Sequence, residues 1–199
     1  MLSNTHDLWT KGMQAAFVVD VTDFLAIKSI DLMLCLEMAS FMLIFCRLYF
    51  GDTKMFQLEN AMSRSIYHRT WENLLSATLL LIQVVAIMGA AALQRTPRQD
   101  LIWFAVLLFA NIIWLCCRTC RNNRLVADLL RSSKMKRDRN ALLKLNSSML
   151  IWILNNVVCV SVLAVLAFQL RGAMTCYIGF VVIIGSSVLD LWGTKNHYR

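Results

Sequence analysis

Five apolar runs dominate this chain and limit the folds that are open to it. Each is about 20 residues long, which is the length of α-helix that crosses the roughly 30 Å hydrocarbon core of a bilayer. Such runs leave no face of a helix for water, so a soluble helical protein is the weaker interpretation. We therefore expect an all-α, polytopic transmembrane helical bundle with about five spans, forming a single membrane domain over residues 1–199. We place the spans at residues 32–50, 73–93, 101–117, 149–168 and 174–192.

The last two runs are separated only by a short break at Arg171 and Gly172. As one helix, residues 149–192 would be roughly 66 Å long at 1.5 Å per residue. That is about twice the thickness of the hydrocarbon core. Two antiparallel spans joined by a tight turn are therefore the better interpretation of this stretch.

The residue composition also favours a membrane protein. Apolar residues make up 58% of the chain and charged residues only 16%, whereas in soluble domains about half of the residues are apolar and about a quarter are charged. The seven cysteines lie in or beside apolar runs. There a thiol usually acts as a small buried hydrophobe, and no disulfide framework is predicted.

The N-terminal segment, residues 1–31, is mildly amphipathic. Asp20, Asp23 and Asp31 fall on one face of a helix. We expect a helix lying at the membrane surface or the exposed start of the first span. The alternative is that residues 15–31 enter the bilayer, which would fold the N-terminus back inside. The segment lacks a basic stretch followed by an apolar core, so we expect no cleaved signal peptide.

The first span is expected to end at Phe50, because Gly51 suits a helix C-cap and Asp52 can start a turn. Arg47 lies within one turn of that end, so we expect its side chain to extend to the membrane interface.

The stretch from Arg118 to Lys144 holds nine of the 20 basic residues and only two acids. With five spans, 15 basic residues fall on the side of this stretch and five on the other side. Cytoplasmic loops carry such an excess of Lys and Arg. We therefore expect a multi-pass protein of an inner or plasma membrane, with the N-terminus outside, the C-terminus in the cytoplasm and a basic cytoplasmic loop over residues 118–147.

Within this basic loop, residues 125–130 form one apolar helical edge, and a cationic cluster follows Ser132 and Ser133. We expect a helix–break–helix at the cytoplasmic surface that contacts anionic lipid or, in second place, a soluble acidic protein. Nucleic acid is not expected, because no aromatic residue lies between Arg118 and Lys144 to stack on a base. The residues expected to make the contacts are Arg131, Lys134, Lys136, Arg137 and Arg139.

Glutamate or amide side chains occur inside four of the five spans. Glu37 is the only acid in the first span, and its depth depends on where that helix begins. Amides occur in three further spans, at Gln83, Asn111, Asn155 and Asn156. Interhelical hydrogen bonds are the first explanation, because polar groups in lipid must find partners within the protein. If these side chains converge on one axis, they would line a pore or a polar seam.

No catalytic motif is present, so we expect neither an enzyme nor a cofactor. Cys117 and Cys120 form a CxxC with Cys116 beside it, but no second pair or nearby histidine completes a metal site. Acylation of these cysteines is an alternative. The three histidines lie outside the spans, and the opposed pairs that a membrane haem needs are absent.

These observations predict a non-enzymatic integral membrane protein that presents a basic cytoplasmic loop to a protein partner or to anionic lipid, as a sensor, anchor or effector subunit. The alternative is a small oligomeric ion or proton channel, with Glu37 and the intramembrane amides along its path. In either case we expect a homo-oligomer, since association buries several intramembrane polar groups.

Overall fold

The computed structural model of the chain describes residues 2–26, 31–62, 70–91, 96–130, 136–169 and 172–193. All the regular elements in these residues are α-helices, as predicted. In chain order they are α1 (Leu2–Ala26), α2 (Leu32–Met62), α3 (Thr70–Ala91), α4 (Pro97–Leu130), α5 (Lys136–Gln169) and α6 (Ala173–Gly193).

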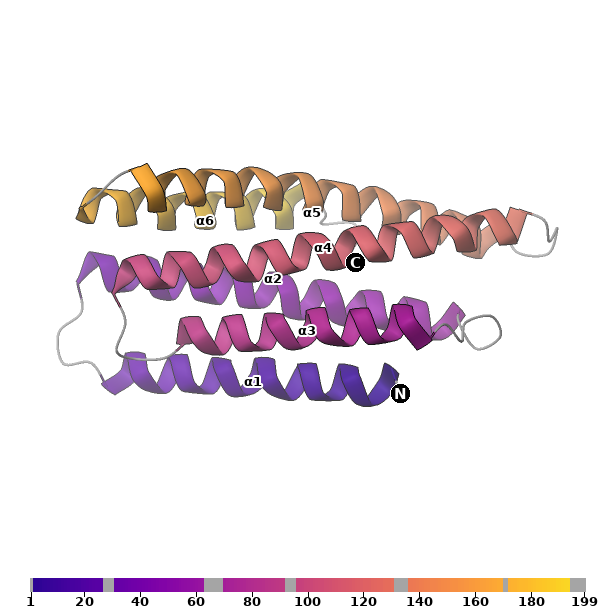
Figure 1. Cartoon of the computed structure of the whole chain (residues 1–199), viewed down its shortest axis with the longest axis horizontal. Helices are drawn as coiled ribbons and strands as arrows, with labels where there is room; N and C mark the ends of the chain where they lie inside the picture. The colour runs from indigo at the N-terminus through magenta and orange to yellow at the C-terminus, as the bar shows by residue number, and fades with distance from the viewer. Residues whose placement is uncertain are drawn as a thin grey trace.

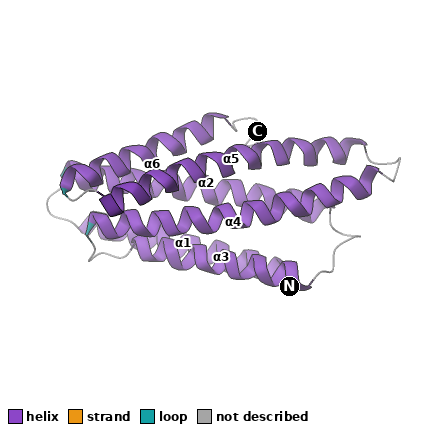
Figure 2. Ribbon diagram, turned by 45° about the horizontal axis from the view of Figure 1, so that its top comes forward, coloured by secondary structure: helices purple, strands orange, loops and turns teal. Residues whose placement is uncertain are grey.

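The six helices lie lengthwise in one bundle (Figures 1 and 2). Each contacts the next around the bundle in the order α1, α3, α4, α5, α6, α2 and back to α1. Across the bundle, α4 also contacts α6 and α2. Helices consecutive in the chain run in opposite directions, whereas the neighbours α1 and α3, and likewise α2 and α6, run in the same direction (Figure 1).

Five of these helices are long and apolar enough to cross a membrane, which fits the predicted multi-pass protein. Their outward faces carry large exposed apolar side chains, such as Leu81 on α3, Phe109 on α4, Leu154 on α5 and Val181 on α6. Such faces suit lipid rather than water. The apolar segments are Leu32–Gly51, Leu74–Ala91, Pro97–Arg124, Leu143–Leu166 and Met174–Gly193.

The N-terminal segment does not lie across the end of the bundle as a surface helix would. Instead α1 runs alongside α3 and also contacts α2. Trp9, Met13 and Ala16 of α1 are fully buried, because they lie on one helical face that closes the bundle. This packing brings Leu2 toward the same end of the bundle as the last turn of α6 (Figure 1).

The apolar span ends at Gly51, close to the predicted Phe50, but the predicted helix stop there is wrong, because α2 continues without interruption to Met62. Gly51 is buried inside this helix rather than capping it. Arg47 therefore lies in mid-helix, and its side chain points into the bundle with only 4% of its surface exposed. The expectation that Arg47 extends to the membrane interface is thus also wrong.

The basic region is built as two extensions of spanning helices. α4 and α5 are 34 residues long, whereas α6 has 21. The difference corresponds to roughly 20 Å of helix, and Figure 1 shows α4 and α5 projecting together beyond α6. The predicted break at Ser132 and Ser133 lies outside the described residues, between the end of α4 and the start of α5.

The turn between the last two spans is as predicted, since α5 and α6 are separate antiparallel helices. Gly172 has a φ of 131°, which residues with a side chain rarely adopt. Its carbonyl accepts a hydrogen bond from the Thr175 N–H at 3.2 Å as α6 begins.

Side-chain caps fix where two other helices begin. At α4, the Gln99 side chain accepts the Thr96 N–H at 2.9 Å, which is one of the two bonds of a capping box, and Pro97 is the first helical residue. At α2, the Asp31 carboxylate accepts the Leu34 N–H at 2.8 Å.

Replacing Asp31 by alanine should lower the free energy of unfolding by about 1 kcal/mol, because the first turn of α2 loses its side-chain acceptor. Asp31→Asn is the matched control, since its amide oxygen can accept the same hydrogen bond. The measurement is SDS-induced unfolding in mixed micelles, followed by tryptophan fluorescence. Equal stability of the alanine and asparagine variants would contradict the cap.

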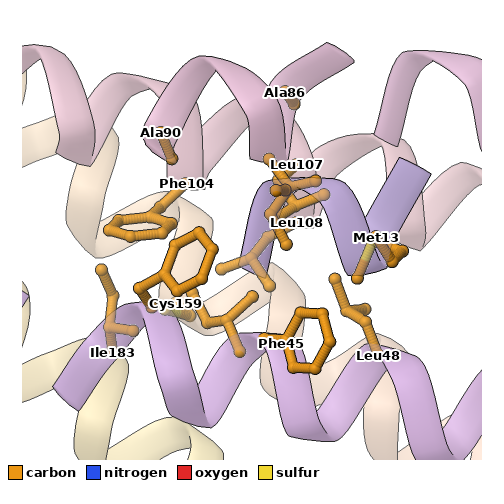
Figure 3. Packing of buried hydrophobic residues seen from close by; sticks show 14 of the residues in the cluster. Met13, Phe45, Leu48, Ala86, Ala90, Phe104, Leu107, Leu108, Cys159 and Ile183 are labelled. Carbon is orange, nitrogen blue, oxygen red and sulfur yellow. The ribbon is translucent and has the colours of Figure 1, made fainter. Parts of the chain in front are cut away.

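Apolar side chains from all six helices fill the bundle between these ends. Figure 3 shows part of this core, where Phe104 and Leu108 of α4 lie among Phe45 of α2, Cys159 of α5 and Ile183 of α6. The Phe104 and Phe180 rings pack edge to face, with centroids 6.5 Å apart. This packing fixes the distances between the helices and therefore the positions of the polar side chains between them.

Candidate functional site

A buried ion pair joins two spans that are far apart in the sequence. The Arg47 guanidinium of α2 pairs through Nε with Asp190 Oδ2 of α6. The Asp190 side chain has no exposed surface and that of Arg47 has 4%. The two charges can be buried together because they are in direct contact and the pair has no net charge.

Amide groups from α4 and α5 extend this ion pair into a network across four helices. Arg47 Nη2 donates a hydrogen bond to Asn156 Oδ1. Asn156 Nδ2 in turn donates to Asn111 Oδ1 at 2.9 Å. Asn155 donates from Nδ2 to the Ser186 carbonyl at 2.8 Å, which ties α5 to α6 beside Asp190. We call Arg47, Asp190, Asn111, Asn155 and Asn156 the polar network.

Two residues proposed for the same polar seam lie outside this network. Glu37 is in the second turn of α2, which begins at Leu32, so it lies only about 7 Å along the helix from its start. It interacts with Asp100 near the start of α4. Gln83 of α3 is fully buried, and its side chain has no hydrogen-bond partner among the described residues.

The structure thus brings three of the five seam residues together and leaves the other two apart. Sequence reasoning missed the charged pair at the centre of the network. A signal was present: Arg47 and Asp190 stand near the ends of two spans that run in the same direction, which puts opposite charges at similar depth.

The second candidate region is the basic end of the bundle. Arg118 and Arg121 of α4 are only 1% and 6% exposed. The Arg118 guanidinium lies over the Trp114 ring, 5.1 Å from its centroid. Arg124, one turn further along α4, is exposed. The charge count treats all basic residues alike, so the sequence had no signal that two of these arginines turn inward.

The projecting parts of α4 and α5 are joined by a side-chain hydrogen bond. Asn146 Nδ2 of α5 donates to Asn123 Oδ1 of α4 at 2.7 Å. We call these paired extensions, Arg118 to Leu130 of α4 and Lys136 to Asn146 of α5, together with the segment that joins them in the sequence, the basic hairpin. Of the predicted contact residues, Arg131 and Lys134 lie outside the described residues. Lys136, Arg137 and Arg139 belong to the first turn of α5, where only the backbone is described.

The three clustered cysteines lie along α4, with Cys116 and Cys120 exposed and Cys117 half-buried. Within the described parts of the chain, no group of three or more His, Cys, Asp or Glu residues is placed to hold a metal ion.

Comparison of the chain with family models, with curated proteins and with solved structures gives no match.

Proposed function

We propose that the protein is a non-enzymatic membrane subunit that uses its basic hairpin to bind an anionic surface, either an acidic protein or anionic lipid. The observation that carries this proposal is the continuous extension of α4 and α5 beyond the other helices. The pairing of Asn123 with Asn146 holds the two extensions together. A paired hairpin presents its charges at lower entropic cost than a flexible loop, which supports a binding role.

We further propose that both ends of the chain face the cytoplasm, together with the basic hairpin, in an inner or plasma membrane. The support is the course of α1, which brings Leu2 toward the hairpin end of the bundle. This revises the expectation of an external N-terminus. The charge asymmetry agrees with it, since the opposite end then keeps Lys28, Arg95, Arg98 and Arg171, while Lys11 lies within α1.

An oligomeric ion or proton channel takes second place. Three of its proposed lining residues make hydrogen bonds within the polar network, and one of them, Asn156, accepts its bond from Arg47. A guanidinium stays charged under all ordinary conditions and repels cations. Glu37 is shallow in α2 rather than central. These observations support a structural use of the amides better than a conduction path.

Reversing the cluster of Lys134, Lys136, Arg137 and Arg139 to glutamate should strongly weaken binding of an anionic partner. The probe is polyglutamate, added to the full chain in nanodiscs of zwitterionic lipid. Each basic residue near an anionic membrane surface contributes about 1 kcal/mol to binding, and we expect a similar contribution toward polyglutamate. Four reversals should therefore weaken binding on the order of a hundredfold to a thousandfold at low salt.

The matched control reverses the same number of charges at Lys28, Arg95, Arg98 and Arg171, which lie outside the basic hairpin in the sequence. This control should leave the affinity for polyglutamate close to that of the unmodified protein. Binding that survives reversal of the hairpin cluster, or that falls equally in both variants, would rule out the hairpin as the binding surface.

A further inference from the structure

A cavity of about 260 Å³ lies between α3 and α4 at the base of the basic hairpin. Arg118, Arg121 and Arg124 of α4 contribute three positive charges to its lining. Ser76 of α3 adds a hydroxyl, and none of the described lining residues is acidic. The cavity is just below the roughly 300 Å³ at which sites for drug-sized molecules begin, so it suits one compact anionic group.

The lining residues have the chemistry that recognises phosphate. Guanidinium groups match phosphate oxygens with paired N–H donors, and they are less strongly hydrated than ammonium groups. The Trp114 ring beneath Arg118 orients one of these guanidinium groups through a cation–π contact. Because Arg118 and Arg121 are buried by the fold, they need no large ordering step on binding.

The position of the cavity along α4 selects a lipid as the source of the phosphate. The apolar segment of α4 runs from Pro97 to Arg124, so the three arginines fall at its hairpin end, at the depth of headgroups. Exposed apolar side chains continue from this level toward the middle of the same two helices, including Leu74 and Leu81 on α3 and Ile113 on α4. These faces can accommodate acyl chains below a bound headgroup.

We propose that this cavity binds the phosphate of an anionic phospholipid. Basic pockets between spanning helices on the cytoplasmic side are known to hold such headgroups. The inference rests on the proposed function, because it takes the same end of the bundle as the anion-binding end. It goes further by assigning the lipid to Arg118, Arg121 and Arg124 rather than to Lys134, Lys136, Arg137 and Arg139.

Cysteine labelling tests the proposal on the unmodified protein. Cys116 and Cys120 line the cavity and are exposed, whereas Cys35 is exposed on α2 away from it. Purified protein in detergent is treated with N-ethylmaleimide, and labelling rates are read peptide by peptide by mass spectrometry. Phosphatidylglycerol should slow labelling of Cys116 and Cys120 on the order of tenfold near saturation, by occupying the site. Labelling of Cys35 should not change, and phosphatidylcholine, in which a choline cation offsets the charge of the phosphate, should protect Cys116 and Cys120 much less.

Two variants then assign the lipid to the cavity. Arg124→Gln removes an exposed cavity arginine, so the fold should tolerate it. Lys144→Gln removes an exposed charge elsewhere on the basic hairpin. The phosphatidylglycerol concentration that gives half-protection should rise about tenfold for Arg124→Gln, the equivalent of one charge-assisted hydrogen bond. It should stay unchanged for Lys144→Gln.

Several results would overturn the cavity as a phospholipid site. These are equal protection by both lipids, equal protection of Cys35, or the same shift in both variants. Protection by millimolar inorganic phosphate equal to that by phosphatidylglycerol would assign the site to soluble phosphate instead. If phosphatidylglycerol does not protect Cys116 and Cys120 but polyglutamate still binds, the cavity is rejected as a lipid site and the proposed function is retained. If phosphatidylglycerol protects the two cysteines but polyglutamate does not bind, the proposed binding role of Lys134, Lys136, Arg137 and Arg139 is rejected and the cavity is retained.

Discussion

Replacing Asp190 by leucine should lower the free energy of unfolding by about 3–5 kcal/mol. The variant leaves the Arg47 guanidinium buried beside α6 without its counter-charge. That guanidinium cannot lose its proton, and its hydrogen bond to Asn156 supplies no negative charge. SDS titration in mixed micelles, followed by tryptophan fluorescence, measures the change.

The reverse substitution should be less harmful. Arg47→Met leaves Asp190 alone, but a lone buried carboxyl can take up a proton and become neutral. The double variant, Arg47→Met with Asp190→Leu, removes both charges and should be more stable than Asp190→Leu alone, because an ion pair replaced by packed apolar groups is often neutral for stability.

A control for the polar network is Ser161→Ala. Ser161 is exposed on α5 and bonds only to the Val157 carbonyl of its own helix, at 2.8 Å. Its replacement should change stability by less than about 0.5 kcal/mol. If the double variant is as unstable as Asp190→Leu, or if Asp190→Leu behaves like Ser161→Ala, then the ion pair does not hold α2 and α6 together as described.

Replacing Gly89 by alanine should lower the free energy of unfolding by about 1–3 kcal/mol, although alanine is the better helix former. A Cβ at Gly89 of α3 would lie 2.7 Å from Cδ2 of the Trp103 indole on α4. Two further indole atoms, Cε3 and Cε2, lie within 2.9 Å. An indole is rigid, so the two helices would have to separate along their contact.

The matched control is Gly185→Ala in α6, where an added Cβ meets nothing within 4 Å. This variant should be as stable as the unmodified protein or more stable by up to about 1 kcal/mol. Adding Trp103→Leu to the Gly89→Ala chain should recover part of the loss by opening space. If Gly89→Ala and Gly185→Ala have the same stability, the close contact between α3 and α4 is not what selects glycine at position 89.

Gly89 begins a run of small residues, Gly89 to Ala92, near the end of the second apolar segment. A run of Gly and Ala in an apolar segment predicts that a neighbouring helix approaches closely. It cannot say which helix approaches or which side chain fills the space. In the structure the neighbour is α4, and the side chain is Trp103.

Arg47 shows the same limit for charged residues. Its place near the end of an apolar run predicted an interfacial side chain, because a local sequence shows no partner. The partner, Asp190, is 143 positions away and comes to Arg47 only because α2 and α6 lie side by side. Three of the amides were correctly expected to need hydrogen-bond partners, and the partners are Arg47, each other and the Ser186 carbonyl.

The sequence by itself determined the five apolar helices, their approximate positions and the concentration of positive charge between the third and the fourth. These properties depend on runs of neighbouring residues, and the cost of placing polar groups in lipid makes such runs decisive. Only the tertiary structure decided that α1 joins the bundle, that Arg47 pairs with Asp190, and that Arg118 and Arg121 turn inward. These outcomes depend on which helix faces meet, and that choice is made by packing between residues far apart in the chain.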